Sequence, residues 1–206
     1  MSTSENTKSS KWVAYLIEGG ILILALVLVL VIRFAVYEPA LVISKSMEPS
    51  LKVDDRVLLD HRESLHGHWR RGDIVLFAAP SSWNEDPAEE LPLEDRDQLI
   101  KRVVGLPGET VAVFVDKVWI NGKLLTEKYI KPTPEAGSRG GDLVQPRPVQ
   151  LKLGPGQYFV MGDNRGNSED SRLHGPISDR DIMGRAVRIF WPLGHAGGLP
   201  LPDYNL

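Results

Sequence analysis

The sequence of 206 residues contains no cysteine. This absence excludes disulfide bonds, thiolate metal sites and a cysteine nucleophile. The net charge is only −3 and no basic stripe is present, so we expect no nucleic-acid partner. The length suits one ordinary domain with an appendage, and the apolar content is sufficient for a hydrophobic core.

Motifs for metal binding are also missing. His61, His66 and His68 lie close together in a polar stretch, but the sequence has no H-E-x-x-H motif. That motif places two histidines on one face of a helix, where they can share a metal ion. We therefore expect the three histidines to belong to a solvated loop, and the sequence predicts no metal and no other cofactor.

A long apolar run lies near the N-terminus. Residues 19–32 contain no charged side chain, and extension to residues 12–37 reaches the roughly 20 residues that a bilayer core requires. We therefore predict a transmembrane anchor helix over residues 12–37. The polar residues 1–11 before it are predicted to form a disordered cytoplasmic tail.

A cleavable signal peptide is the main alternative to an anchor. The residues after the apolar run, from Arg33 to Tyr37, include bulky side chains where a cleavage site requires small ones, which favours an uncleaved anchor. A buried soluble helix is disfavoured because the run has no polar face. Lys8 and Lys11 outnumber Arg33 across the span, which favours a cytoplasmic N-terminus and an extracytoplasmic remainder.

Residues 38–206 are predicted to form a mainly β domain, either a sandwich or a partly open barrel. Short apolar or alternating runs are bounded by glycine and proline, and no long amphipathic helix follows the anchor. Asn121-Gly122 is typical of a two-residue type I′ hairpin turn. Loops are expected at 79–97, which is acidic, and at 131–148, which is rich in proline and glycine. The predicted strands cover residues 56–60, 73–78, 99–104, 110–115, 118–120, 157–161 and 184–190.

A catalytic serine requires a group that removes its hydroxyl proton, and a lysine is one candidate. In its predicted strand, Lys101 shares a face with Leu99 and Val103, while Ile100 and Arg102 point to the other face. Apolar neighbours disfavour the charged ammonium and lower the pKa of a lysine. On its own, however, this pattern also fits a lysine that points to solvent, as most lysines in strands do.

Four blocks of the sequence resemble the motifs of the bacterial type I signal peptidases, the membrane-anchored Ser-Lys proteases that remove signal peptides from exported proteins. The blocks are SKSMEPSL at 44–51, RGDIVLF at 71–77, IKRVVGLPGE at 100–109 and GDNRGNSEDSR at 162–172. They occur in the family's order behind an N-terminal apolar run. The resemblance implies a protease of the bacterial plasma membrane whose partners are the lipid bilayer and preproteins that carry signal peptides.

The resemblance also assigns roles to individual residues. Ser46 is implied as the nucleophile and Lys101 as its general base. Ser44 is similar to the serine whose hydroxyl contributes to an oxyanion hole, and Ser168 to the serine that orients the lysine. Supporting roles are implied for Asp170 and Arg172 as a structural pair, and for Asp163 and Arg165 as braces of their loop.

Substrates with small residues one and three positions before the cleaved bond are implied as well. Bulky residues are expected to form the shallow pockets for these positions, namely Val42, Met47, Leu51, Leu99 and Ile100. One position departs from the pattern, because Gly166 stands where the family usually has aspartate. We expect this loop to lose some bracing by charge.

Two other functions fit parts of the sequence. A LexA-like protease also uses a Ser-Lys pair, but it requires a DNA-binding helix-turn-helix, and this chain has an apolar run in its place. A non-catalytic, membrane-tethered β module requires no nucleophile or base. The presence of Ser46, Lys101 and Ser168 at motif positions favours the signal peptidase over both alternatives.

Overall fold

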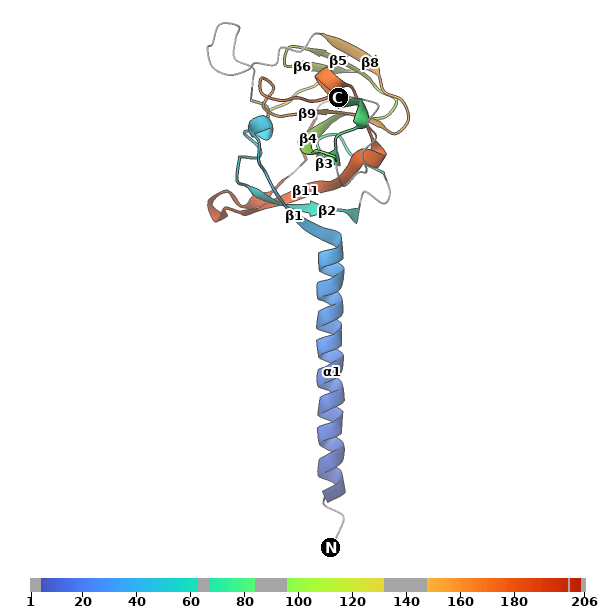
Figure 1. Ribbon diagram of the computed structural model, residues 1–206, viewed down its shortest axis with the longest axis vertical. Helices are drawn as coiled ribbons and strands as arrows, with labels where there is room; N and C mark the ends of the chain where they lie inside the picture. The colour runs from blue at the N-terminus through green and yellow to red at the C-terminus, as the bar shows by residue number, and fades with distance from the viewer. Residues whose placement is uncertain (1–4, 63–66, 84–95, 132–147, 200, 205–206) are drawn as a thin grey trace. The chain divides into compact units, whose positions relative to one another are not determined.

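The computed structural model describes two compact units, Met1–Glu38 and Pro39–Leu206. The first unit is dominated by one helix, α1 (Glu5–Val36), which is drawn in blue in Figure 1. The second unit consists of two β-sheets with short helical turns between the strands. The described residues are 5–62, 67–83, 96–131, 148–199 and 201–204.

The helix α1 begins earlier than the sequence predicts. Residues 5–11 are helical, although they were predicted to belong to a disordered tail, and residues 1–4 lie outside the described residues. Each residue added to an existing helix gains a backbone hydrogen bond, so a helix that starts in the apolar run extends readily over polar neighbours. Within the part of the chain that is described, no helix is both long enough and apolar enough to cross a membrane.

The larger sheet has eight strands, in the order β1, β2, β11, β3, β4, β9 and β10, with β12 paired to β11 (Figure 1). The described strand registers in this sheet are antiparallel. Because β11 lies between β2 and β3, the C-terminal part of the chain supplies an interior strand of the sheet. The strands are β1 (Tyr37–Leu41), β2 (Arg56–Asp60), β3 (Ile74–Ala78), β4 (Gln98–Gly105), β9 (Gln157–Met161), β10 (Ile177–Ser178), β11 (Ile182–Trp191) and β12 (Gly197–Gly198).

The smaller sheet has four strands in the order β7, β6, β5 and β8. Its β6–β7 hairpin turns at Asn121 and Gly122, whose φ angles are 50° and 82°. Positive φ at both turn residues is the requirement of a type I′ turn, so the predicted hairpin turn is confirmed. The strands are β5 (Thr110–Phe114), β6 (Lys117–Ile120), β7 (Lys123–Leu124) and β8 (Val149–Lys152).

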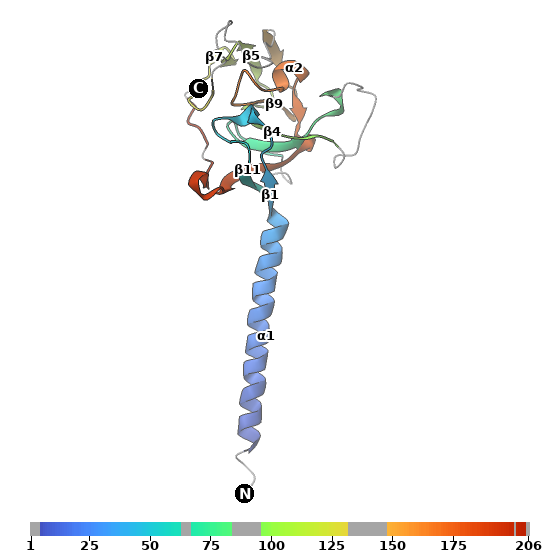
Figure 2. The same cartoon turned by 60° about the vertical axis from the view of Figure 1, so that its left-hand side comes forward.

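Short helical turns connect these strands. They are η1 (Lys45–Met47), η3 (Ser81–Trp83), α2 (Ser171–His174), η5 (Asp179–Asp181) and η6 (Leu193–His195). The helix α2 contacts β9, as Figure 2 shows, and η1 contacts β4. These two turns matter for the site. The turn η1 lies within the SKSMEPSL motif, and α2 begins in the last two residues of the GDNRGNSEDSR motif.

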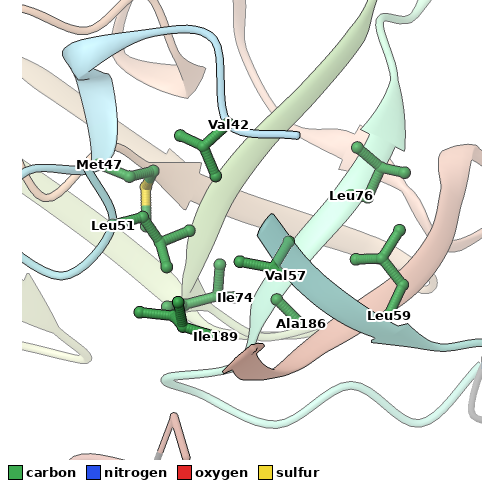
Figure 3. Close-up of a cluster of buried hydrophobic side chains, with 9 residues drawn as sticks. All are labelled: Val42, Met47, Leu51, Val57, Leu59, Ile74, Leu76, Ala186 and Ile189. Carbon is green, nitrogen blue, oxygen red and sulfur yellow. The ribbon is translucent and has the colours of Figure 1, made fainter. Parts of the chain in front are cut away.

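Clusters of buried apolar side chains hold the second unit together. In the first core cluster, side chains of β2, β3 and β11 meet those around η1, and Figure 3 shows Met47 and Leu51 pointing toward Ile74. A second cluster contains Val111 and Val118 of the smaller sheet together with strands β4 and β9 of the larger one. Because this cluster draws side chains from both sheets, it packs them against each other.

The prediction of a mainly β domain is confirmed. Strands β2 and β9 have the predicted bounds, and the other predicted strands differ by one or two residues at their ends. The remaining strands, β1, β7, β8, β10 and β12, were not predicted because they are too short for clear alternation or, in β1, contain a proline. Residues 84–95 and 132–147, the main parts of the two predicted loops, lie outside the described residues.

Candidate active site

Ser46 lies in the short turn η1, which is held against the sheet by its apolar neighbours. Met47 and Leu51 are fully buried in the first core cluster, and Pro49 stops the turn from continuing as a helix because it lacks an N–H. Ser46 itself is buried, and its Oγ lies 3.1 Å from Oγ of Ser44. The turn therefore presents two serine hydroxyls side by side.

Lys101 comes from the middle of β4, where it lies opposite Val75 of β3. Its Nζ donates a hydrogen bond of 2.8 Å to Oγ of Ser46, and the side chain is only 4% exposed. Burial lowers the pKa of Lys101 from its ordinary value of 10.5 to about 8, although the negative charges of Asp170 and Glu169 oppose this shift. A lysine with this pKa can accept a proton near neutral pH.

Ser168 lies near the pair but bonds to a different partner from the one predicted. Its hydroxyl donates to Oδ2 of Asp170 at 2.8 Å, whereas the recorded hydrogen bond of the Lys101 amine goes to Ser46. The predicted hydrogen bond between Ser168 and Lys101 is therefore not formed among the described residues. The hydroxyl proton of Ser168 goes to Asp170 because an ionised carboxylate is a stronger acceptor than an amine.

Asp170 and Arg172 form the expected pair, with distances of 2.8 Å and 2.9 Å between Arg172 nitrogens and Asp170 oxygens. Burial alone would raise the pKa of Asp170. The guanidinium of Arg172, the N–H of Gly162 and the hydroxyl of Ser168 outweigh burial and hold this pKa below its ordinary value. The carboxylate thus stays ionised, and its charge is balanced by Arg172 rather than by Lys101.

Gly162 allows these segments to approach each other. A Cβ atom at this position would collide with Oγ of Ser168 and with the backbone carbonyl oxygen of Ser46. Both of those groups have fixed positions in the site, so neither can move away cheaply. The glycine of the GDNRGNSEDSR motif is therefore required for close packing around the serines.

Asp163 and Arg165 are each paired with a residue outside their motif. Asp163 accepts two hydrogen bonds from Arg102, at 2.8 Å and 2.7 Å. Arg165 binds both carboxylate oxygens of Glu127, at 2.5 Å and 3.0 Å. The expected loss of bracing at Gly166 is not seen at Arg165, because Glu127 supplies the carboxylate.

Ser46 and Lys101 line a cleft of about 380 Å³. Of the five expected pocket residues, Leu99 lines this cleft, because it shares a face of β4 with Lys101. The other four do not: Val42, Met47 and Leu51 belong to the first core cluster (Figure 3), and Ile100 packs against that cluster. Among the described residues, the lining consists of Ser44, Lys45, Ser46, Ala79, Trp83, Asp97, Leu99, Lys101, Asn167, Ser168, Glu169 and His174.

Comparison with known proteins identifies the family. The family described as "Signal peptidase, peptidase S26" matches residues 12–191. The chain belongs to the signal peptidase family. A signal peptidase I of Leptolyngbya laminosa is 39% identical over 88% of this chain and 82% of its own, and signal peptidase I T of Bacillus subtilis is 33% identical over 93% of each chain.

A solved signal peptidase I from Enterococcus faecalis overlaps with a TM-score of 0.40 and 30% sequence identity, covering 57% of this chain and 96% of that chain. Because this TM-score is low, the family assignment rests on the family match and the sequence relatives. The matched region of this signal peptidase, residues 12–191, contains all four motif blocks.

An aromatic pair at the cleft of this signal peptidase was not predicted. The ring of His174 stacks on Trp83, with 5.0 Å between ring centroids and 24° between ring planes, and both residues line the cleft. Trp83 follows β3 and His174 ends α2, so no local pattern could have joined them. Among the described residues, no group of three or more His, Cys, Asp or Glu side chains is arranged to hold a metal ion.

Proposed function

We propose that this signal peptidase cleaves signal peptides from exported preproteins by a Ser-Lys mechanism, with Ser46 as the nucleophile and Lys101 as the general base. The observation that carries the proposal is the 2.8 Å hydrogen bond from Nζ of Lys101 to Oγ of Ser46. A general base must lie within hydrogen-bond reach of the proton that it removes, and its pKa must lie near the working pH. Lys101 meets both requirements, because burial lowers its pKa to about 8.

The reaction proceeds through an acyl-enzyme. Oγ of Ser46 attacks the carbonyl carbon of the scissile peptide bond, its proton passes to Nζ of Lys101, and the carbonyl electron pair moves onto oxygen. The C–N bond then breaks, and Lys101 gives its proton to the leaving amine, which leaves an ester on Ser46. Water then gives a proton to the same lysine and adds to the ester carbonyl. The C–Oγ bond breaks, Oγ of Ser46 takes the proton back from Lys101, and the acid product is released.

The developing oxyanion requires donors close to Ser46. We assign this role to the backbone N–H of Ser46 and to the hydroxyl of Ser44, which lies 3.1 Å from the nucleophilic oxygen. Ser168 lines the cleft together with Lys101, and its hydroxyl is held by Asp170. Since Arg172 balances the charge of Asp170, the lysine keeps the low pKa that a base needs.

The membrane arrangement is part of the same proposal. The helix α1 anchors the enzyme in the bacterial plasma membrane, the N-terminal tail is cytoplasmic, and residues 38–206 form an extracytoplasmic catalytic domain with the two-sheet signal-peptidase fold. In support, residues 19–32 carry no charge, and the large apolar side chains of α1 are exposed. The substrates are preproteins with small residues one and three positions before the cut, and the lipid bilayer is the second partner.

Cleavage of a purified preprotein in detergent tests the dyad. Ser46→Ala and Lys101→Met should each reduce turnover by several orders of magnitude, and the double variant should lose little more, because nucleophile and base act as one unit. Gln150→Ala, which removes an exposed amide from β8, serves as the control and should keep wild-type turnover. Near wild-type cleavage by a folded Ser46→Ala variant would contradict the proposal.

Labelling of a single cysteine tests the topology. Ser82→Cys would introduce the only thiol of the chain, at an exposed position in η3. An impermeant maleimide should label it in intact spheroplasts. Labelling that occurs only after the membrane is lysed would place the catalytic domain on the cytoplasmic side instead.

A further inference from the structure

Asn164 is not part of the turn η1, which carries Ser46, but it forms hydrogen bonds to this turn. Its side-chain Nδ2 donates a hydrogen bond of 3.0 Å to the carbonyl oxygen of Lys45. Its backbone N–H donates a second hydrogen bond of 3.0 Å to the carbonyl oxygen of Ser46. One residue of the GDNRGNSEDSR motif therefore holds two successive carbonyl groups of η1.

The rest of the structure fixes Asn164 itself. The residue is only 7% exposed, and its carbonyl oxygen accepts a 2.9 Å hydrogen bond from the N–H of Asn167. Its backbone also forms a parallel β-bridge with Lys131. Asn164 does not line the cleft described above, and its hydrogen bonds to η1 link it to the site through the turn.

The first of these hydrogen bonds determines the direction of a backbone donor. The peptide bond between Lys45 and Ser46 is trans, and in a trans peptide the C=O and N–H groups point in opposite directions. Because the carbonyl of Lys45 points toward Asn164, the N–H of Ser46 points away from Asn164. Among the described residues, this N–H donates to no acceptor outside η1.

The turn has little internal support for this orientation. A short 3₁₀ turn leaves most of its carbonyl groups without an intrahelical partner. The carbonyl of Lys45 receives one other hydrogen bond, from the N–H of Glu48, and this bond is long at 3.2 Å. Without the amide of Asn164, the Lys45–Ser46 peptide could rotate, and the N–H of Ser46 would lose its fixed direction.

We infer that Asn164 is a positioning residue for the oxyanion hole: its side-chain amide orients the Lys45–Ser46 peptide so that the N–H of Ser46 can donate to the oxyanion. The inference rests on the proposed function, since it requires Ser46 to be the nucleophile. An amide suits this role because it donates to a carbonyl, whereas an ionised carboxylate of the same size has no proton to donate.

Kinetics and inhibitor binding of two variants test the inference. Asn164→Ala removes the side chain, and Asn164→Asp keeps its size without the donor. Loss of one oxyanion donor costs about 100- to 1000-fold in kcat, so loss of its orientation should cost about 10- to 100-fold, with KM nearly unchanged. Gln150→Ala, the exposed amide on β8, should keep wild-type values.

The affinity for a substrate-like peptide aldehyde is a second measurement, and a purely structural role of Asn164 would leave it unchanged. Oγ of Ser46 adds to the carbonyl carbon of the aldehyde, and the carbonyl electron pair becomes the oxyanion that the N–H of Ser46 would bind. The affinity for the aldehyde should fall by the same factor as kcat in both variants. The acid limb of kcat/KM for Asn164→Ala should stay at the wild-type pH, because Lys101 keeps its surroundings.

Three results would overturn the inference while Ser46→Ala remains inactive. They are unchanged kcat in both variants, lower kcat with unchanged aldehyde affinity, and unfolding of both variants, which would give Asn164 a purely structural role. An active Ser46→Ala variant would instead overturn the proposed function. The two failures are therefore distinguishable.

Discussion

Lys101 and Arg102 are consecutive residues of β4 with almost completely buried side chains, yet their environments differ sharply. Lys101 donates to one neutral hydroxyl, that of Ser46, and burial lowers its pKa to about 8. Arg102 donates to both carboxylate oxygens of Asp163 and to the carbonyl of Gly72. Burial alone would lower the pKa of Arg102, but Asp163 holds it above its ordinary value.

The partner, and not the degree of burial, decides the direction in which the pKa of each side chain moves. A buried cation is stable when a carboxylate and further acceptors surround it, and it loses its proton more easily when they are absent. Since successive strand residues point to opposite faces, β4 supplies a candidate base on one face and a structural ion pair on the other. Substitutions at either position test the two environments separately.

Replacement of Lys101 should have the largest effect on activity. We predict that Lys101→Met lowers kcat/KM by about four to six orders of magnitude, as loss of a base does in a coupled catalytic unit. Methionine fills similar space without a buried amine, so the free energy of unfolding should not fall. Preprotein cleavage and urea denaturation, measured on the same preparation, check both statements.

Lys101→Arg is the informative companion variant. It keeps a positive charge but cannot give up its proton near neutral pH, so it should be as inactive as Lys101→Met. A substantially active arginine variant would show that the positive charge, and not a neutral amine, is what the site requires.

Replacement of Arg102 should instead reduce stability. Arg102→Met leaves Asp163 buried without its partner, and loss of one member of a buried ion pair costs about 3–5 kcal/mol. The double variant Arg102→Met/Asp163→Leu should recover most of this free energy, because it removes the unpaired charge. Urea denaturation followed by tryptophan fluorescence checks the prediction, and an Arg102→Met variant as stable as the wild type would contradict it.

Removal of Glu169 should have the smallest effect, on pH dependence alone. The neutral fraction of Lys101 increases as the pH rises through about 8, so kcat/KM should rise with pH in this range. The negative charge of Glu169 raises the pKa of Lys101, so Glu169→Gln should move the acid limb to lower pH. The charge-matched control Asp203→Asn lies outside the cleft and should leave the limb in place.

The acid limb of Glu169→Gln could instead move to higher pH. That result would mean that the variant desolvates Lys101 less or that another group controls the profile. Salt provides a second check, because Glu169 is exposed and its effect on the limb should shrink as ionic strength rises.

Local patterns in the sequence predicted much of the fold. Strands such as β2 and β9 have apolar runs between turn residues, and the dipeptide Asn121-Gly122 by itself predicts the hairpin turn. The site was predictable only through the motif resemblance, which pointed to Ser46 and Lys101, residues 55 positions apart. Nothing in the alternation of β4 distinguishes a buried lysine from an exposed one.

Ion pairs between residues far apart in the sequence could not be predicted from local sequence patterns. The pairs Arg102–Asp163 and Arg165–Glu127 join residues 61 and 38 positions apart, and their geometry depends on how the strands are ordered. The expected pocket residues Met47 and Leu51 illustrate the opposite error, since bulky apolar side chains near a nucleophile can equally pack into the core. Hydrophobicity alone does not say which surface a side chain contacts.

Direct titration of the Lys101 amine tests the central claim. The full chain, labelled with ¹³C at lysine Cε and held in detergent, would be followed by NMR from pH 6 to pH 12, with Lys101→Met used to assign the signal. We predict a midpoint at about pH 8, well below the ordinary value of 10.5, because burial without a carboxylate partner disfavours the ammonium. A midpoint near 10.5 would contradict the account, since the amine would then be as protonated as an ordinary surface lysine at the pH where the enzyme works.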